Sequence, residues 1–288
     1  MAEARLAVRK TYKLYIGGAF GRSESGRSYL VSGREGRALA NAALASRKDV
    51  RDAVVAARKA HPGWAAATAY NRGQVLYRVA EMLEGRRAQF AEALEVGEGL
   101  AHGEASAAVD AAVDRLVWYA GWADKFAQVA GSSNPVAGPY FDFSVPEPTG
   151  VVGLLAPQSS SLVGLVSVVA PVITTGNAAV VIASEAYPLP ALDLAEVLAT
   201  SDLPGGVVNI LTGRTAELAP VLAAHRDVDA LDLAGAPADL EVSLEQAAAD
   251  NVKRVLRRAR SADWAEEPGP ERMLFFVETK TVWHPIGT

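Results

Sequence analysis

Three consecutive serines, Ser159 to Ser161, are the first candidates for chemistry in this sequence, because each hydroxyl could attack a carbonyl carbon. A serine hydroxyl becomes a useful nucleophile only beside a general base that removes its proton. The adjacent residues supply no such base, since Gln158 precedes the serines and Leu162 follows them. We therefore interpret the three serines as a turn between a strand and a helix.

Cysteine, a stronger nucleophile than serine, does not occur among the 288 residues. Its absence excludes disulfides, cysteine-ligated zinc, iron–sulfur clusters and thiol catalysis within this chain. The four histidines are well separated along the sequence: His61, His102, His225 and His284. Their spacing predicts no metal site.

The composition is typical of a compact folded protein, with 50% hydrophobic and 21% charged residues. The formal net charge of -5 gives no general attraction to phosphate backbones or anionic lipids. Residues 1–10 contain no apolar core, and the most hydrophobic run, 151–183, is interrupted by Gly, Pro and polar residues. We expect a cytoplasmic protein with no nucleic-acid partner and no membrane partner.

One basic cluster stands out from this acidic balance: Lys253, Arg254, Arg257, Arg258 and Arg260. No aromatic residues are interleaved with it, as they often are in nucleic-acid contacts. We predict a solvated helix face near a C-terminal end, where positive charge suits the helix dipole. Contact with an anion or a nucleic acid is the alternative.

Four helices are predicted in the first half of the chain, after short antiparallel strands at 13–16 and 28–31. Ser46 begins the first helix with a capping-box-like pattern, and we expect that helix to end at Pro62-Gly63. The second helix carries an apolar stripe: Leu76, Val79, Ala80 and Leu83. After a short third helix, the fourth is expected from Glu104 to about Val129.

The pattern changes after a stretch rich in Gly, Ser, Asn and Pro, residues 132–139. Four short apolar runs then follow at nearly even spacing, separated by helical stretches: Val151–Leu155, Ala178–Ile182, Val207–Leu211 and Ala230–Leu233. Strand–helix–strand repetition of this kind predicts an α/β fold with a doubly wound, Rossmann-like parallel sheet.

Two further strands, 140–146 and 274–284, flank this block. In the first, Phe141 and Phe143 alternate with polar residues, as in a half-buried strand. Paired together, the two strands would form a small protruding β-sheet with an unpaired row of backbone groups available to another chain. The predicted division of the chain is N-terminal strands and helices, first protruding strand, Rossmann-like block and last protruding strand: 1–134, 135–148, 149–264 and 265–288.

Several segments together resemble the NAD-binding domain of the aldehyde dehydrogenase superfamily in their order and spacing. The central ones are Glu147–Pro157, Gly176-Asn177 leading into Ser184-Glu185, and Pro204–Gly213. Upstream, Tyr15–Gly18 and Ala56–Trp64 resemble the family's N-terminal strands and first helix, and Trp118–Lys125 resembles its long helix. The resemblance covers most of residues 11–240.

The resemblance implies a fold and also a loss of activity. Members of this family bind NAD in the doubly wound domain, and they take a cysteine nucleophile and a glutamate base from the second half of a much longer chain. Here a polar segment after Gly235 leads directly to Lys280–Pro285, which resembles the family's C-terminal oligomerisation strand. The sequence is most similar to the degenerate, cysteine-less half of the family-sixteen group, so we expect the catalytic domain to be absent. The family's oxyanion-stabilising asparagine is Ser159 here.

The resemblance also implies a cofactor site in altered form. Ser184 and Glu185 match the end of the family's Lys-Pro-Ser-Glu motif, which holds the adenosine ribose, but Ile182 replaces the lysine. Gly235 matches the pyrophosphate turn, where the family's hydroxyl side chains are missing and Pro237 removes an amide donor. We therefore expect no catalytic residue and no metal ligand, only Ser184, Glu185 and Gly235 as vestigial cofactor ligands. We expect no cofactor, or NAD if any is retained.

Three functions follow from these observations. The first is a non-catalytic subunit, a pseudoenzyme that associates with a full-length aldehyde dehydrogenase paralogue or with itself through strands 140–146 and 274–284. The second is an NAD(P)-dependent aldehyde oxidoreductase with a partner-supplied active site, and the third is a nucleotide-binding sensor in which Ser184 and Glu185 hold an adenosine. Removing a required nucleophile can lower turnover by about a millionfold, so we prefer the first and expect the chain to be inactive alone.

Overall fold

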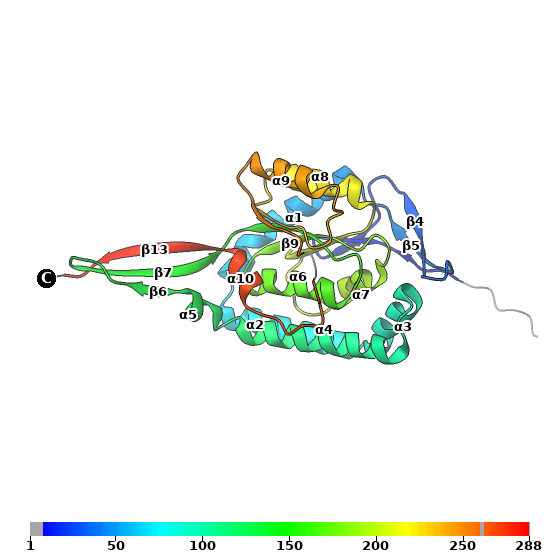
Figure 1. The fold of residues 1–288 in the computed structure, drawn as a ribbon, viewed down its shortest axis with the longest axis horizontal. Coiled ribbons are helices and arrows are strands. Elements are labelled where there is room, and N and C mark those ends of the chain that lie inside the picture. The colour runs from blue at the N-terminus through cyan, green and yellow to red at the C-terminus, as the bar shows by residue number, and fades with distance from the viewer. Residues whose placement is uncertain (1–7, 260–261, 288) are drawn as a thin grey trace, which may run out of the picture.

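The computed structural model describes residues 8–259 and 262–287 (Figure 1). The predictions that concern Arg260 and the first seven residues lie outside the described residues.

A seven-stranded sheet forms the centre of the molecule, with the strand order β12-β11-β8-β9-β10-β2-β3. Its parallel strands are β8 (Val151–Leu155), β9 (Ala178–Ile182), β10 (Val208–Leu211), β11 (Ala230–Asp232) and β12 (Arg254–Leu256). The short strands β2 (Leu14–Ile16) and β3 (Ala19–Gly21) extend it in antiparallel fashion. The predicted doubly wound parallel sheet is confirmed.

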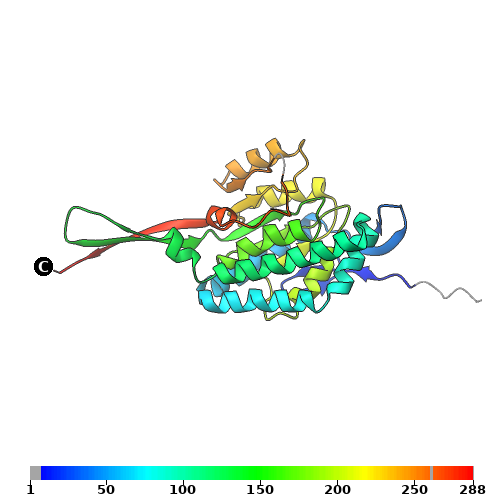
Figure 2. The same cartoon turned by 60° about the horizontal axis from the view of Figure 1, so that its bottom comes forward.

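Helices cover both faces of this sheet (Figure 1, Figure 2). One face carries α1 (Arg47–Ala66) and α8 (Thr215–Ala224), and α9 (Glu241–Ala249) packs against α8. The other face carries α6 (Val163–Thr174) and α7 (Leu189–Leu198), and α6 is covered in turn by α2 (Ala69–Glu84) and α4 (His102–Trp122), with α3 (Arg87–Glu98) against α4. Every residue of α6 is buried, because the sheet lies on one side of it and the outer helices lie on the other. In the part of the chain that the structure describes, no helix combines the length and the apolar character needed to cross a bilayer.

Two smaller sheets join this body. One has the order β1-β5-β4 and contains β1 (Thr11–Tyr12), β4 (Ser28–Ser32) and β5 (Ala38–Ala43). The other has the order β13-β7-β6 and contains β6 (Ser132–Asn134), β7 (Tyr140–Pro148) and β13 (Val277–Pro285). This protruding sheet extends from one end of the molecule, beyond α5 (Phe126–Ala130) and α10 (Glu271–Phe275) (Figure 1). The strand predicted over 274–284 begins only at Val277, since the two residues at 274 and 275 belong to α10.

The alternation in β7 predicts that its phenylalanine face is buried. In the structure the other face, which carries Asp142 and Ser144, is buried. Asp142 is 3% exposed, whereas Phe141 is 49% exposed. The side chain of Asn134, in the unpredicted strand β6, donates to Asp142 Oδ1 at 2.7 Å and to Ser144 Oγ at 2.9 Å. Ser144 Oγ also lies 2.9 Å from Thr281 Oγ1 of β13. The polar side chains of this face therefore form hydrogen bonds to one another within the sheet. Phe141, on the opposite face, is exposed to solvent.

Helix α1 continues past Pro62 to Ala66, so its predicted end at Pro62-Gly63 is wrong. A proline inside a helix removes one backbone hydrogen bond and typically costs about 3 kcal/mol. Trp64, which is 1% exposed, offsets this cost in the last turn, because its indole Nε1–H donates to the Ile173 carbonyl of α6 at 2.8 Å. Tertiary packing keeps this turn helical.

Two other helix predictions are also wrong. The fourth predicted helix is interrupted after Trp122, and α5 begins only at Phe126. The described part of the basic cluster, residues 253–258, is not on a helix: α9 ends at Ala249, and Arg254 lies in the edge strand β12. Arg254 pairs with Glu278 at 2.6 Å, so β12 is tied to the first residues of β13.

Candidate cofactor site

The carboxyl ends of β8, β9, β10 and β11 meet at one edge of the central sheet. The strand order reverses at β8, which has β9 and β10 on one side and β11 and β12 on the other. In open α/β sheets, ligands bind outside the carboxyl ends of the strands at such a switch point. The predicted residues Ser184, Glu185 and Gly235 follow β9 and β11, so the structure brings all three to this edge.

The turn between β8 and α6 holds Ser159 to Ser161, as predicted. Glu98, the last residue of α3, accepts the Ser161 N–H at 2.8 Å, the Ser160 N–H at 3.3 Å and the Ser161 hydroxyl. Backbone N–H groups that converge at the start of a helix attract anions such as phosphate. Here a carboxylate of the chain itself takes that place.

Ser184 and Glu185 link the end of β9 to the neighbouring turns. Ser184 Oγ is buried and donates to the Gln158 carbonyl at 3.0 Å. The Glu185 carboxylate accepts from the Arg214 guanidinium at 2.6 Å and from the Thr215 N–H at 3.0 Å, at the start of α8. Both predicted ribose ligands are thus hydrogen-bonded within the chain.

The charge of Glu185 also acts on a neighbouring phenol. Burial, and next the Glu185 carboxylate, raise the pKa of Tyr29, while the Arg214 guanidinium opposes this shift. Tyr29 is therefore neutral at physiological pH.

Gly235 packs directly against the end of β8. Its N–H donates to the Leu155 carbonyl at 2.8 Å, and a Cβ added at this position would overlap the Ala156 carbonyl oxygen. Only glycine allows so close an approach of two backbones. The glycine of the predicted pyrophosphate turn therefore uses its N–H to join the segment after β11 to the end of β8.

The segment that follows β12 returns to this edge. Trp264 Cδ2 lies 3.5 Å from the position that a Cβ would take on Gly164, in the first turn of α6. The Glu266 carbonyl accepts from the Arg115 guanidinium of α4. Trp264 and the serine turn line a common cavity of about 380 Å³. Residues 262–270, hereafter the 262–270 segment, therefore cover the start of α6.

The sequence alone did not identify the partners Glu98 and Arg214. Glu98 is 63 residues from Ser161, and Arg214 is 29 residues from Glu185, so only the fold brings each pair together. Gln158 could have been found, because it follows a buried strand directly and its amide can bond on two sides. It donates to the Ala156 carbonyl at 3.1 Å and accepts the Glu185 N–H at 2.9 Å.

Comparison with known proteins decides the family. The sequence profile described as "Aldehyde dehydrogenase family" matches residues 21–259. This chain belongs to the aldehyde dehydrogenase family.

Individual relatives agree in extent and in fold. The chain is 32% identical to cytosolic aldehyde dehydrogenase 1 of Elephantulus edwardii, over 84% of this chain and 49% of the relative. It is 34% identical to the mitochondrial benzaldehyde dehydrogenase of Antirrhinum majus, over 84% of this chain and 46% of the relative. The NAD+ complex of an aldehyde dehydrogenase from Bacillus cereus matches the fold with a TM-score of 0.81 at 27% identity, over 85% of this chain and 50% of that one. The chain thus spans about half the length of the aldehyde dehydrogenases that it matches.

The residues at the cofactor edge do not fit NAD as the family resemblance assigns it. Ile182 is fully buried in β9 and carries no donor for a ribose hydroxyl. Glu185 would have to leave Arg214 and the N-terminus of α8, and the Gly235 N–H would have to leave the Leu155 carbonyl. Each loss exposes a polar group that is now satisfied.

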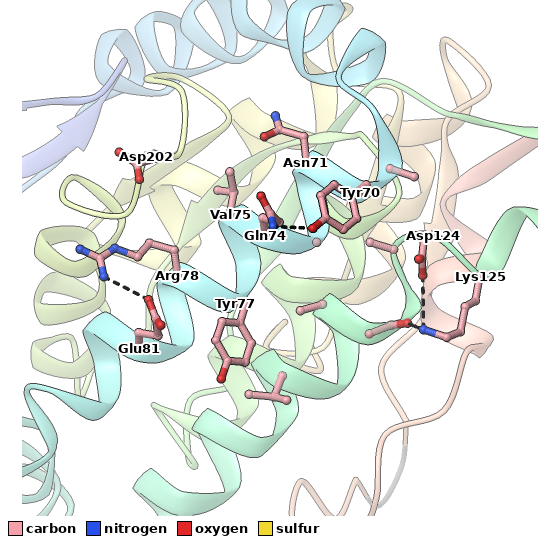
Figure 3. A pocket seen from close by; sticks show the side chains of 16 residues that line it. Tyr70, Asn71, Gln74, Val75, Tyr77, Arg78, Glu81, Asp124, Lys125 and Asp202 are labelled. Atoms are coloured by element: carbon pink, nitrogen blue, oxygen red, sulfur yellow. Dashed lines mark hydrogen bonds and ion pairs between the residues drawn. The ribbon is translucent and has the colours of Figure 1, made fainter.

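A larger cavity, of about 630 Å³, lies away from this edge, between the outer sides of α2 and α4 (Figure 3). Tyr70 and Tyr77 of α2 point into it, and the Tyr70 hydroxyl accepts from the Gln74 amide at 2.9 Å. Lys125, between α4 and α5, also lines it. None of the predicted cofactor residues lines this cavity.

Proposed function

We propose that this chain is a non-catalytic member of the aldehyde dehydrogenase family, which associates through its protruding sheet with itself or with an active aldehyde dehydrogenase. The observation that carries the proposal is the internal pairing at the cofactor edge. Glu98, Glu185 and Gly235 bond to groups of the same chain, in positions where the fold class binds its ligands.

The chemistry of the chain supports the same proposal. Aldehyde oxidation in this family, as the resemblance implies, begins with a thiolate that attacks the carbonyl. The chain contains no cysteine. The serine that comes nearest to such a role, Ser161, donates its hydroxyl to the Glu98 carboxylate and lies 2% exposed. A buried serine next to the start of a helix stabilises the turn and does not reach a substrate.

The protruding sheet supports the association. β13 pairs with β7 along one side only within the described residues, so its other side is an open strand edge. Such an edge is a template for pairing with another chain. Large aromatic side chains are exposed on both faces of this sheet: Tyr140 (42% exposed) and Trp283 (58%) lie together on one face, with ring centroids 5.7 Å apart, and Phe141 (49%) lies on the other. Exposed apolar surface of this kind marks protein–protein contact sites.

The deciding experiment combines an oligomer measurement with an activity measurement on the purified chain. Light scattering should give a dimer or a larger assembly, and Phe141→Asp should shift it to the monomer. Val242→Asp is the matched control, because Val242 is also exposed, at 65%, but lies on α9, where a negative charge suits the first helical turn. A parent chain that is monomeric, and that co-purifies with no aldehyde dehydrogenase, would overturn the association.

The activity arm uses a panel of aldehydes with NAD+ and with NADP+. We expect no growth of the reduced-nicotinamide absorbance from the chain alone. Sustained turnover by a clean preparation would overturn the non-catalytic assignment and favour an oxidoreductase. Calorimetric binding of NAD+ without turnover would instead favour a nucleotide sensor. We place this subunit in the cytoplasm, and fractionation of the source cells checks that location.

A further inference from the structure

A second cavity, of about 390 Å³, lies beneath the 262–270 segment, between α4, α6 and α10. Its size falls within the range of about 300–1,000 Å³ that small-molecule sites occupy. Arg115 and Tyr119 of α4 line it together with Arg272 of α10. It is a different cavity from the one beside the serine turn, although Asp263 and Trp264 line both.

Arg115 is a buried charge whose identified partners are neutral. It is 6% exposed, and its two terminal nitrogens donate to the Ser167 hydroxyl and to the Glu266 carbonyl. Its Nε has no hydrogen-bond partner among the described residues. Burial lowers the pKa of Arg115. A buried guanidinium that faces neutral oxygens is stabilised when a carboxylate joins it.

Arg272 adds a second guanidinium to the same cavity. It pairs with the buried Asp232, and its guanidinium carbon lies 5.5 Å from the centre of the Trp264 ring. Burial lowers the pKa of Arg272 to about 10, so it remains charged at physiological pH. The charges of both Arg115 and Arg272 reach Tyr119 and act to lower its pKa, which burial raises to about 12. The floor of the cavity therefore has two guanidinium groups and a neutral phenol.

The rim of the cavity has the opposite charge. The lining residues Asp263, Glu267 and Glu271 are acidic and exposed, so they lie where the cavity meets solvent. A phosphate or a dicarboxylate would place two negative charges near this rim. A zwitterion would place its carboxylate on the guanidinium floor and its ammonium group towards the rim, and both contacts would be attractive.

We propose that this cavity binds a small amino carboxylate, with its carboxylate at Arg115 and Arg272 and its ammonium group towards Asp263, Glu267 and Glu271. The site goes beyond the proposed subunit function, because it adds a ligand that the chain itself recognises. Trp264 and Phe275 form an apolar wall that accommodates the methylene groups between the two charges.

Titration calorimetry on the full chain tests the proposal with defined probes. Glycine, 4-aminobutanoate and 6-aminohexanoate differ in the separation of their charges, and at least one should bind saturably with one site per chain. Butanoate and butylammonium each carry one of the two charges of 4-aminobutanoate and should bind at least about tenfold more weakly than the best zwitterion. Absence of binding by all three zwitterions at about 10 mM, or equally tight binding of inorganic phosphate, would overturn the proposal.

Two substitutions locate the binding in this cavity. Arg115→Gln should weaken zwitterion binding by about 10- to 100-fold, because a charge-assisted contact is lost. Since this variant can also loosen the 262–270 segment, Glu267→Gln provides a second readout on the exposed rim. It should weaken zwitterion binding by about two- to fivefold and strengthen butanoate binding, a reversal that a folding defect does not produce. Asp114→Asn, on the exposed side of α4, is the control and should change neither affinity. Unchanged affinities in both test variants would refute this location.

Discussion

Replacing Glu98 by alanine tests whether a carboxylate of the chain stabilises the turn at the cofactor edge. The carboxylate accepts the Ser161 N–H at 2.8 Å and the Ser160 N–H at 3.3 Å. A hydrogen bond to a charged group contributes about 1.5–3 kcal/mol, and the lower end applies to the shorter bond because Glu98 is only half-buried. The longer bond and the bond from the Ser161 hydroxyl each add about 0.5 kcal/mol. We expect Glu98→Ala to lower the free energy of unfolding by about 2.5 kcal/mol.

Urea unfolding followed by tryptophan fluorescence, at one fixed protein concentration, measures this change. Glu98→Gln is the matched control, because its amide oxygen still accepts a hydrogen bond but carries no charge, and it should lose about 1 kcal/mol. The alanine variant also leaves the two serine N–H groups available, so sulfate should raise its midpoint more than it raises that of the parent chain. A loss below about 0.5 kcal/mol, with no difference in the sulfate response, would refute the idea that an internal anion holds this turn.

Three further substitutions probe the scaffold. Gly235→Ala should lower the free energy of unfolding by about 1–3 kcal/mol in urea titrations, because its Cβ would overlap the Ala156 carbonyl; an unchanged midpoint would contradict the close contact. Trp64→Phe should lower it by about 1–2 kcal/mol, since the indole bond to Ile173 is lost, and thermal unfolding should show the loss. Burial raises the pKa of Asp193 to about 6, against about 3.9 in an unfolded chain. The folded state therefore binds this proton more tightly, and the free energy of unfolding falls as the pH rises from about 4 to about 6. Asp193→Asn should flatten that decline, and a stability–pH curve parallel to that of the parent chain would show that the shift is absent.

The central sheet could be predicted from sequence because its strands are buried on both faces. A strand that is covered on both sides is a short continuous apolar run, and β8 and β9 match their predicted bounds. β12 lacks this property: its three residues are only partly buried, and it includes Arg254, so the sequence pattern predicts a solvated helix face there. Edge strands contact the core on one side and leave a weaker pattern.

Alternation in β7 showed which residues share a face but not which face is covered. The buried face is polar because Asn134 and Thr281 supply hydrogen bonds to Asp142 and Ser144 from neighbouring strands. One of those partners lies more than a hundred residues away, in β13. Sequence patterns record hydrophobicity along one strand, whereas such a network depends on three strands at once.

At the candidate site, too, the sequence predicted some features and missed others. The positions of Ser184, Glu185 and Gly235 at the strand ends followed from the motifs, and the structure places them at one edge. Their partners did not follow, because Glu98 and Arg214 come from α3 and from the start of α8. A motif identifies a residue type at a strand end, but the charge that reaches it is set by the three-dimensional fold.

Under the proposed function, the internal pairs at this edge also explain how a family scaffold can persist without the family's chemistry. A binding site keeps polar groups that a ligand completes, and each such group costs about 1–3 kcal/mol when it is buried and unsatisfied. In this chain Glu98 accepts an N–H of the serine turn, and Glu185 accepts an N–H at the start of α8. The Gly235 N–H donates to the last carbonyl of β8. The contacts that stabilise the edge are therefore the same contacts that a nucleotide would have to break. If the proposed function holds, stability of the scaffold and weak nucleotide binding follow from one set of hydrogen bonds, and a gain in NAD affinity in any variant should be accompanied by a loss in stability of the free chain.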